Sequence, residues 1–213
     1  MGRVKDIVIK VIPSKVANAF VKKNHYSGKV VNNSVLHFGC FLDGQLGGVL
    51  QYGNPIDKRN VLGLVKTTNK GYNEKWNEML ELNRMAFSDI LPKNSESRSI
   101  SVTIKLIKKN APHVKWVLSF ADGTQCGDGT MYRASGFKLT AINKNSTIYR
   151  LANGGTIAKH GTSKANFNGA KKLKGFQLRY IYLIDKSCEL TCPILPFSKI
   201  DEIGAGMYKG VKH

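Results

Sequence analysis

Acidic residues are scarce in this 213-residue sequence, which has 14 Asp and Glu against 33 Lys and Arg. The net charge of +19 costs self-repulsion unless a polyanion offsets it, so nucleic acid is the first partner to consider. No long basic amphipathic helix accompanies the charge, which disfavours a membrane surface as the partner. The apolar share of 42% is that of an ordinary folded protein.

Signals for secretion, membrane insertion and metal binding are also lacking. The four cysteines form no C-x-x-C pair, so a zinc knuckle is not supported, and free thiols in a reducing cytoplasm are expected. We find no signal peptide and no apolar run of membrane length. No metal site is predicted; the one pairing worth testing for a metal ion is His25 with Asp122.

Strand-like and helix-like patterns alternate, which predicts an α/β or α+β class. Apolar, β-branched runs predict strands over residues 4–12, 36–42, 46–52, 79–87, 114–120, 137–142 and 176–184. Asp43-Gly44 predicts a hairpin between two of them. Helices are expected after Pro13-Ser14 and over residues 128–135.

One segment is ambiguous, because SISVTIKLIKK fits both a strand and a helix. Ile100, Ile104 and Ile107 share a helical stripe, whereas alternate apolar residues suit a strand. Serines upstream and lysines with Asn110 downstream favour a helix.

The character of the chain changes near residue 150. We expect residues 1–150 to form a catalytic core, with 151–213 supplying a basic loop or arm and a C-terminal strand that completes the sheet. Lysines bind phosphate without reading sequence, so this basic extension is predicted to contact nucleic acid. The residues expected to bind it are Lys159, Lys164, Lys171, Lys172, Lys174 and Arg179.

The stretch FADGTQCGDGTMYRASGF places an acid, Asp122, where a buried strand ends, and Tyr132 on a short helix beyond it. Strand ends are where open sheets hold ligands, so the stretch predicts a site. Arg84 lies inside the apolar strand segment ELNRM, and a buried arginine needs an anionic partner, for which Asp122 is available. A structural salt bridge is the alternative.

Two further motifs carry polar groups. NHYSG gathers His25 and Tyr26 in a turn, which suits proton transfer, although such a pair is more often structural. KNSESRSIS places hydroxyl side chains and Arg98 at a helix start, where backbone N–H groups attract phosphate. A capped surface helix explains that motif equally well.

These motifs in this order resemble the Mom family of phage DNA-modification proteins. The resemblance runs from HYSG through QYG, ELNRM, KNSESRSIS and SFADG to GTMYRASGF, and covers most of the first 150 residues. That family is similar to the GNAT acyltransferases, so a GNAT-like mixed central sheet flanked by helices is implied. The segment from Asn94 through Ser97 and Arg98 to Ser99 matches the place where GNAT proteins bind acetyl-CoA or a related acyl donor, with serines where glycines are usual.

The resemblance implies conversion of the N6 amine of adenine in double-stranded DNA to N6-methylcarbamoyladenine, which protects phage DNA from restriction in the cytoplasm of the infected host. The implied catalytic residues are His25, Tyr26, Arg84, Asp122 and Tyr132. We expect the base to be flipped out, with His25 as the favoured base and Asp122 as its orienter. Acetyl transfer alone leaves the nitrogen of the product unexplained, so a different donor or a further step is required.

Two other functions remain open at this point. One is a conventional GNAT acetyltransferase acting on a protein or a small molecule. The other is a non-enzymatic DNA-binding protein built on the same fold.

Overall fold

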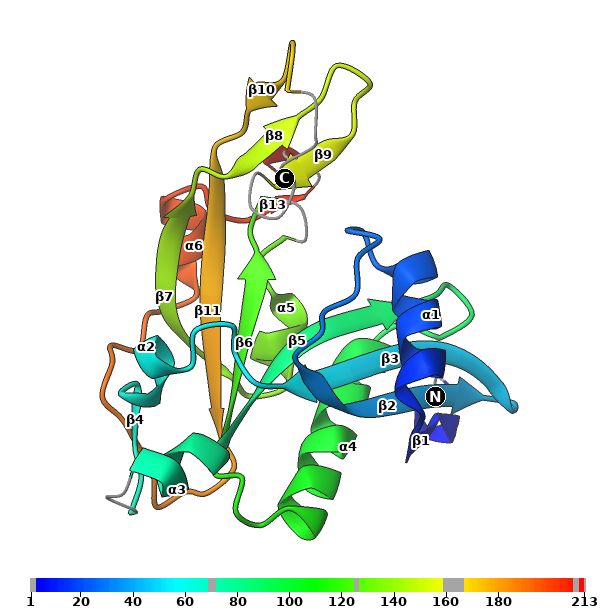
Figure 1. Cartoon of the computed structure of the whole chain (residues 1–213), viewed down its shortest axis with the longest axis vertical. Helices are drawn as coiled ribbons and strands as arrows, with labels where there is room; N and C mark the ends of the chain where they lie inside the picture. Colours follow the sequence, from blue (N-terminus) through cyan, green and yellow to red (C-terminus); the bar gives the residue numbers. More distant parts are fainter. Residues whose placement is uncertain (1–2, 69–71, 125–126, 159–166, 209–210, 213) are drawn as a thin grey trace. The chain divides into compact units, whose positions relative to one another are not determined.

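The computed structural model describes residues 3–68, 72–124, 127–158, 167–208 and 211–212 (Figure 1). The chain divides into two compact units. Unit 1 comprises Met1–Ser119, Met131–Phe137 and Ile181–Cys192, and unit 2 comprises Phe120–Thr130, Lys138–Tyr180 and Pro193–His213. A division at residue 150 stays a prediction.

The main strands of unit 1 combine antiparallel and parallel pairing, which confirms the mixed α/β class. In spatial order they are β1 (Val8–Val11), β2 (Ser34–Leu42), β3 (Gln45–Gly53), β5 (Met79–Phe87) and β6 (Trp116–Asp122). The first four pair antiparallel, and β5 pairs parallel with β6. The predicted hairpin is confirmed, since Asp43 and Gly44 have φ values of 51° and 80° between β2 and β3.

The predicted strand over residues 4–12 begins later than expected. Residues Arg3–Asp6 form a 3-10 helix, and the strand β1 starts at Val8. The Arg3 guanidinium contacts the carboxylates of Asp6 and Asp43, at 3.4 and 2.6 Å. The contact with Asp43 joins this turn to the tip of the β2–β3 hairpin, and local β propensity does not register a contact between such distant residues.

Helices and two short strands complete unit 1. They are α1 (Ser14–Asn24), α2 (Arg59–Leu62), α3 (Tyr72–Asn77), α4 (Ser95–Asn110), α5 (Thr130–Ala134), β4 (Val65–Lys66) and β12 (Glu189–Leu190). The ambiguous segment is helical, as predicted, because Ile100, Ile104 and Ile107 are at most 5% exposed along one face of α4. Ala17 and Val21 of α1 are fully buried in a core cluster.

Unit 2 contains β7 (Lys138–Asn145), most of β11 (Gly175–Leu183) and α6 (Ser198–Glu202). The segment predicted to be a loop or arm includes three short antiparallel strands in the order β10-β8-β9. These are β8 (Ile148–Arg150), β9 (Thr156–Ala158) and β10 (Lys171–Lys172), and β13 (Met207–Tyr208) pairs with β14 (Val211–Lys212). These strands were not predicted because each has only two or three residues, too few to show an alternating pattern in a polar segment.

No helix in the described part of the chain is long and apolar enough to span a membrane.

Candidate active site

The parallel ladder between β5 and β6 ends at the pair Leu82 and Ser119, although both strands continue beyond it. The Ser119 hydroxyl donates to the Leu82 carbonyl oxygen over 2.9 Å. The Ser119 and Tyr132 hydroxyls are hydrogen bonded at 2.8 Å. Tyr132 is 6% exposed. Its phenol therefore belongs to a buried polar network that ties α5 to the end of the ladder.

A β-bulge on β5 sets the side chains of the ELNRM motif. Gln51 of β3 pairs with Arg84, and the next residue, Tyr52, pairs with Leu82, so Asn83 has no partner in the ladder. Asn83 and Leu82 are both buried, at 9% and 3% exposure. The bulge interrupts the two-residue alternation of side chains at this point of β5.

Asn83 supplies a polar group that the sequence analysis did not select. Its Oδ1 accepts a hydrogen bond from the Ser34 hydroxyl at 2.7 Å, while its Nδ2 is buried with no hydrogen-bond partner among the described residues. Leaving a buried amide donor unsatisfied costs about 1–3 kcal/mol. Bulges and unsatisfied buried groups concentrate at functional sites, so this amide is a candidate for contacting a ligand.

Arg84 connects β5 with the loop that follows His25. Its Nε donates to the Lys29 carbonyl at 3.3 Å, and its Nη1 donates to the Asn83 carbonyl at 2.8 Å. These backbone contacts place a positive charge beside His25, and they bring the NHYSG and ELNRM motifs close to one another. The expected partner Asp122 lies in unit 2, where its Oδ1 accepts the Thr124 N–H at 3.0 Å. The Arg84–Asp122 pair stays a prediction.

The His25 ring has a defined hydrogen-bonding pattern. Its Nδ1 accepts the backbone N–H of Ser27 at 3.1 Å and lies 2.8 Å from the Ser27 hydroxyl. Because Nδ1 accepts from an amide, the proton of the neutral ring is on Nε2. Burial, with help from the Arg84 charge, lowers the pKa of His25 to about 4. At neutral pH the ring therefore presents an N–H donor rather than a basic lone pair.

Tyr26 is arranged differently from His25. Its ring is tilted by 32° over the imidazole with centroids 4.2 Å apart, and the residue is 56% exposed. An exposed aromatic face beside a polar cluster suits stacking against a nucleobase.

Glu81 is a titratable group that the sequence analysis quoted but did not assign. Burial raises the pKa of its carboxyl to about 7, and the opposing pull of the Arg84 charge is smaller. A carboxyl that titrates near neutrality is matched to general-base work. The sequence could have indicated Glu81 as a site residue, because Glu81 and Arg84 are the two charged residues of ELNRM. Only burial distinguishes it from a surface acid.

The predicted donor-binding segment begins α4. Asn94 precedes the helix in the left-handed conformation, with φ of 69°. Ser97 and Arg98 are at least partly exposed on the first turn, so their side chains fit a phosphate, together with the Ser97 backbone N–H; the Arg98 N–H donates to the Asn94 carbonyl at 3.1 Å. Ser99 is fully buried and accepts a hydrogen bond from the Cys40 thiol at 3.2 Å. The Ser99 side chain therefore occupies the core and is not available to bind a donor.

The predicted DNA-binding residues fall into three groups. Lys171, Lys172 and Lys174 are exposed in unit 2. Arg179 instead forms internal contacts, because its Nε and Nη2 donate to the hydroxyl and carbonyl of Thr140 at 2.9 and 3.2 Å. Lys159 and Lys164 lie outside the described residues.

Among the residues that the structure describes, no group of three or more His, Cys, Asp or Glu side chains could hold a metal ion.

Sequence comparison links the chain to one family. The sequence model of the Mom protein family matches residues 6–199. The methylcarbamoylase Mom of Escherichia phage Mu is 42% identical over 151 residues, which are 69% of this chain and 58% of that protein. The chain thus spans less than two thirds of the length of this relative.

Structural comparison gives the fold. The ribosomal-protein-S18-alanine N-acetyltransferase from Escherichia coli has a TM-score of 0.50 at 10% identity, over 84% of this chain and 94% of that chain. A Salmonella typhimurium protein with its cofactor acetyl-CoA has a TM-score of 0.51 at 9% identity, over 85% and 95% of the two chains. The expected acetyltransferase-like fold is confirmed.

Proposed function

Since this chain belongs to the Mom protein family, we propose that it converts the N6 amine of adenine in DNA to N6-methylcarbamoyladenine. The observation that carries the proposal is the 42% identity to the phage Mu methylcarbamoylase, which runs together with an acetyltransferase-like fold. The modification would protect phage DNA from restriction in the cytoplasm of the host. The net charge of +19 supports a polyanionic substrate.

The reaction joins N6 of adenine to an electrophilic carbon of the donor, while N6 loses one proton and the donor loses its leaving group. The exocyclic amine is a poor nucleophile, because its lone pair is delocalised into the ring. Proton removal during attack is therefore the step that protein groups must assist, and a positioned base contributes about 10²–10⁴ in rate.

Glu81 is the base that the electrostatics favour. The raised pKa of about 7 leaves a useful fraction of carboxylate at neutral pH and keeps that carboxylate basic enough to accept the proton. His25 is less suited, because its pKa of about 4 makes it a weak base and its Nε2 bears the proton. Asp122 is the alternative base, or the group that orients Arg84.

His25 and Arg84 would then act as donors. The Nε2–H of His25 and the guanidinium of Arg84 would stabilise negative charge that develops on a donor oxygen, a kind of contribution worth about 2.7–4 kcal/mol per group. Tyr26 would stack against the flipped adenine. Tyr132 would act from the buried network at the end of the β5–β6 ladder.

An acyl-CoA-type donor fits the start of α4, where Asn94, Ser97 and the Arg98 side chain would hold its phosphates; the buried Ser99 would support this turn from the core. When bound, such a donor would supply an activated carbonyl group. The acetyl group of acetyl-CoA contains no nitrogen, whereas the methylcarbamoyl group has one between its carbonyl and its methyl. We therefore propose a nitrogen-containing donor group, or a further step that supplies that atom.

The deciding experiment expresses the chain in bacteria, digests the DNA to nucleosides and measures their masses. We expect a heavier deoxyadenosine species with the mass of the methylcarbamoyl adduct. The matched control is Arg84→Gln, which removes one charge from the candidate site and is expected to abolish the species. Unmodified DNA from cells that contain the folded wild-type chain would refute the proposal, and an N-acetyl mass would identify an ordinary acetyl donor instead.

A further inference from the structure

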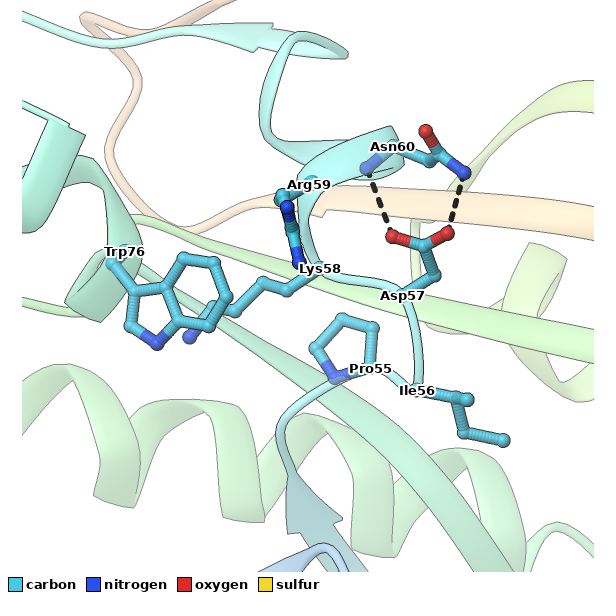
Figure 2. A pocket seen from close by; sticks show the side chains of 7 residues that line it. All are labelled: Pro55, Ile56, Asp57, Lys58, Arg59, Asn60 and Trp76. Carbon is cyan, nitrogen blue, oxygen red and sulfur yellow. Dashed lines mark hydrogen bonds between the residues drawn. The ribbon is translucent and has the colours of Figure 1, made fainter.

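A pocket of about 590 Å³ lies in unit 1, and its lining includes neither His25 nor Arg84 (Figure 2). It is formed by the loop after β3, the start of α2 and one aromatic residue of α3. The lining residues are Pro55, Ile56, Asp57, Lys58, Arg59, Asn60 and Trp76. No motif in the sequence analysis pointed to this loop.

The Lys58 side chain is a buried cation with neutral partners. Its Nζ donates to the Asn54 Oδ1 at 2.7 Å and lies 4.7 Å from the centroid of the Trp76 ring, and the residue is 4% exposed. No carboxylate of the described residues lies within ion-pairing distance of this ammonium. Burial lowers the pKa of Lys58.

The one acidic residue of the pocket lining, Asp57, forms no ion pair with Lys58. The Asp57 carboxylate accepts hydrogen bonds from the side-chain amide of Asn60 at 2.6 Å and from its backbone N–H at 3.4 Å. Arg59 adds a second, exposed cation to the lining. Burying a charge without an opposite charge is costly, so the pocket favours an anionic ligand that contacts both cations.

The apolar groups of the pocket indicate what the anion is attached to. Trp76 supplies a large aromatic surface on which a base can stack, and such stacking is sequence-tolerant. Ile56 is 94% exposed, and Figure 2 shows its side chain on the other side of Pro55 from Trp76. Proteins that unstack DNA insert an exposed aliphatic side chain of this kind between bases.

Strand pairing brings the pocket loop close to the candidate active site. The loop begins at Asn54, directly after Gly53, and Gly53 pairs with Glu81 of β5. Trp76 and Glu81 are five residues apart in the chain, a span of at most about 18 Å. A nucleotide in the pocket would therefore lie within a few nucleotides of an adenine beside Glu81.

We propose that this pocket binds one nucleotide of the DNA strand, with its phosphate on Arg59 and Lys58, its base stacked on Trp76, and Ile56 separating it from the neighbouring base. This deepens the proposed function, because it assigns a second contact to the same DNA substrate. It rests on that function only for the choice of DNA over other nucleotides.

The test measures binding to a single-stranded, adenine-containing oligonucleotide, without any donor, by tryptophan fluorescence and by anisotropy of a labelled strand. Trp76 is the reporter, because the other tryptophan, Trp116, is 1% exposed. We expect quenching in the wild type and weaker binding by roughly 5- to 100-fold in Trp76→Ala. Trp76→Phe should keep most of the affinity, because phenylalanine still stacks, but should lose the quenching.

Two exposed variants avoid any effect on folding. Arg59→Gln should weaken binding and lower its salt dependence, and Ile56→Ser should reduce binding to a duplex more than to a single strand. The charge-matched control is Lys105→Gln on the exposed face of α4, which should change neither the quenching nor the duplex preference.

A comparison with free AMP and CoA distinguishes the sources of the nucleotide. Tighter binding of the oligonucleotide than of AMP or CoA supports the proposal, whereas equal quenching by AMP or CoA would overturn the assignment to DNA. Unchanged affinity in both Trp76→Ala and Arg59→Gln would overturn the pocket itself. Because the assay needs no turnover, absence of DNA modification would refute the proposed function while leaving this result intact.

Discussion

The hydroxyls of Ser119 and Tyr132 lie 2.8 Å apart at the point where the β5–β6 ladder ends. The Ser119 hydroxyl also donates to the Leu82 carbonyl at this last ladder pair. One serine therefore links both strands of the parallel pair to the short helix α5. Tyr132 can take part in the chemistry or can serve only as a structural residue. These two roles can be distinguished, because the same hydrogen bond is removed by changing either Tyr132 or Ser119.

Tyr132→Phe and Ser119→Ala both remove the hydrogen bond between the two hydroxyls. Each is expected to lower the free energy of unfolding by about 1 kcal/mol, as measured by urea denaturation. If the phenol takes part in the chemistry, Tyr132→Phe should reduce adenine modification far more than Ser119→Ala does. Equal losses of activity in the two variants would reduce Tyr132 to a structural residue.

Glu81→Gln tests the proposed base. Because the carboxyl must be ionised to accept a proton, wild-type modification should rise with pH through about 7, the pKa of Glu81. The variant should lose about 10²–10⁴ in rate and should lose that pH step. Asp122→Asn is the parallel variant, and a step near pH 7 that survives in Glu81→Gln would assign the base to another residue.

His25 and Glu81 should make opposite contributions to the pH dependence of stability. The pKa of His25 is lowered from 6.5 to about 4 on folding, so its contribution is complete above pH 6.5 and is lost as the pH falls toward 4. The pKa of Glu81 is raised from 4.5 to about 7, so its contribution is complete below pH 4.5 and is lost as the pH rises through 7.

The two contributions therefore oppose each other between about pH 4.5 and 6.5. Relative to the wild type, His25→Gln should become less stable as the pH rises through this window, and Glu81→Gln should become more stable. Urea unfolding at several pH values measures both trends. Parallel curves for the wild type and both variants would contradict the burial of these two groups.

Ser99→Gly restores the residue that GNAT proteins usually have at this position. The Ser99 side chain is buried and accepts a hydrogen bond from the Cys40 thiol. The change is therefore expected to lower the free energy of unfolding by about 1 kcal/mol without tightening CoA binding. Ser97→Gly, at a partly exposed position on the same turn, is the comparison. Calorimetric titration with CoA should show any gain in affinity there, and a gain in Ser99→Gly would contradict the structural role of Ser99.

Replacing Lys171, Lys172 and Lys174 with glutamine should weaken DNA binding uniformly across sequences. It should also reduce the slope of log affinity against log salt by up to about 2.7, since each phosphate that a lysine no longer neutralises removes about 0.9. Arg179→Gln should instead lower stability and leave the slope unchanged, because its guanidinium is bonded to Thr140. Anisotropy titrations at several salt concentrations measure the slope.

Several features could be predicted because they depend on local sequence. Asp43-Gly44 fixes a two-residue hairpin, since both residues accept positive φ. The stripe of Ile100, Ile104 and Ile107 fixes α4, since only a helix buries all three on one face. The family could also be predicted, because ordered motifs such as HYSG and ELNRM persist in the sequence.

The bulge at Asn83 and the placement of Ser99 needed the structure. A bulge depends on register with the neighbouring strand β3, and ELNRM alone gives no sign of which residue drops out of the ladder. Ser99 lies in a motif that suggests phosphate binding, yet its neighbour Cys40 comes from a strand 59 residues away.

The sequence by itself determined the charge, the order of the longer strands and helices and the family, because composition, periodicity and motif order are properties of the chain. The tertiary structure alone decided which acid is a candidate base and which cation lacks an opposite charge among the described residues. Burial raises the pKa of Glu81, and burial leaves the Lys58 ammonium with only neutral partners among the described residues. Both effects arise from removing a charge from water, and only the packing of distant segments around that charge can do so.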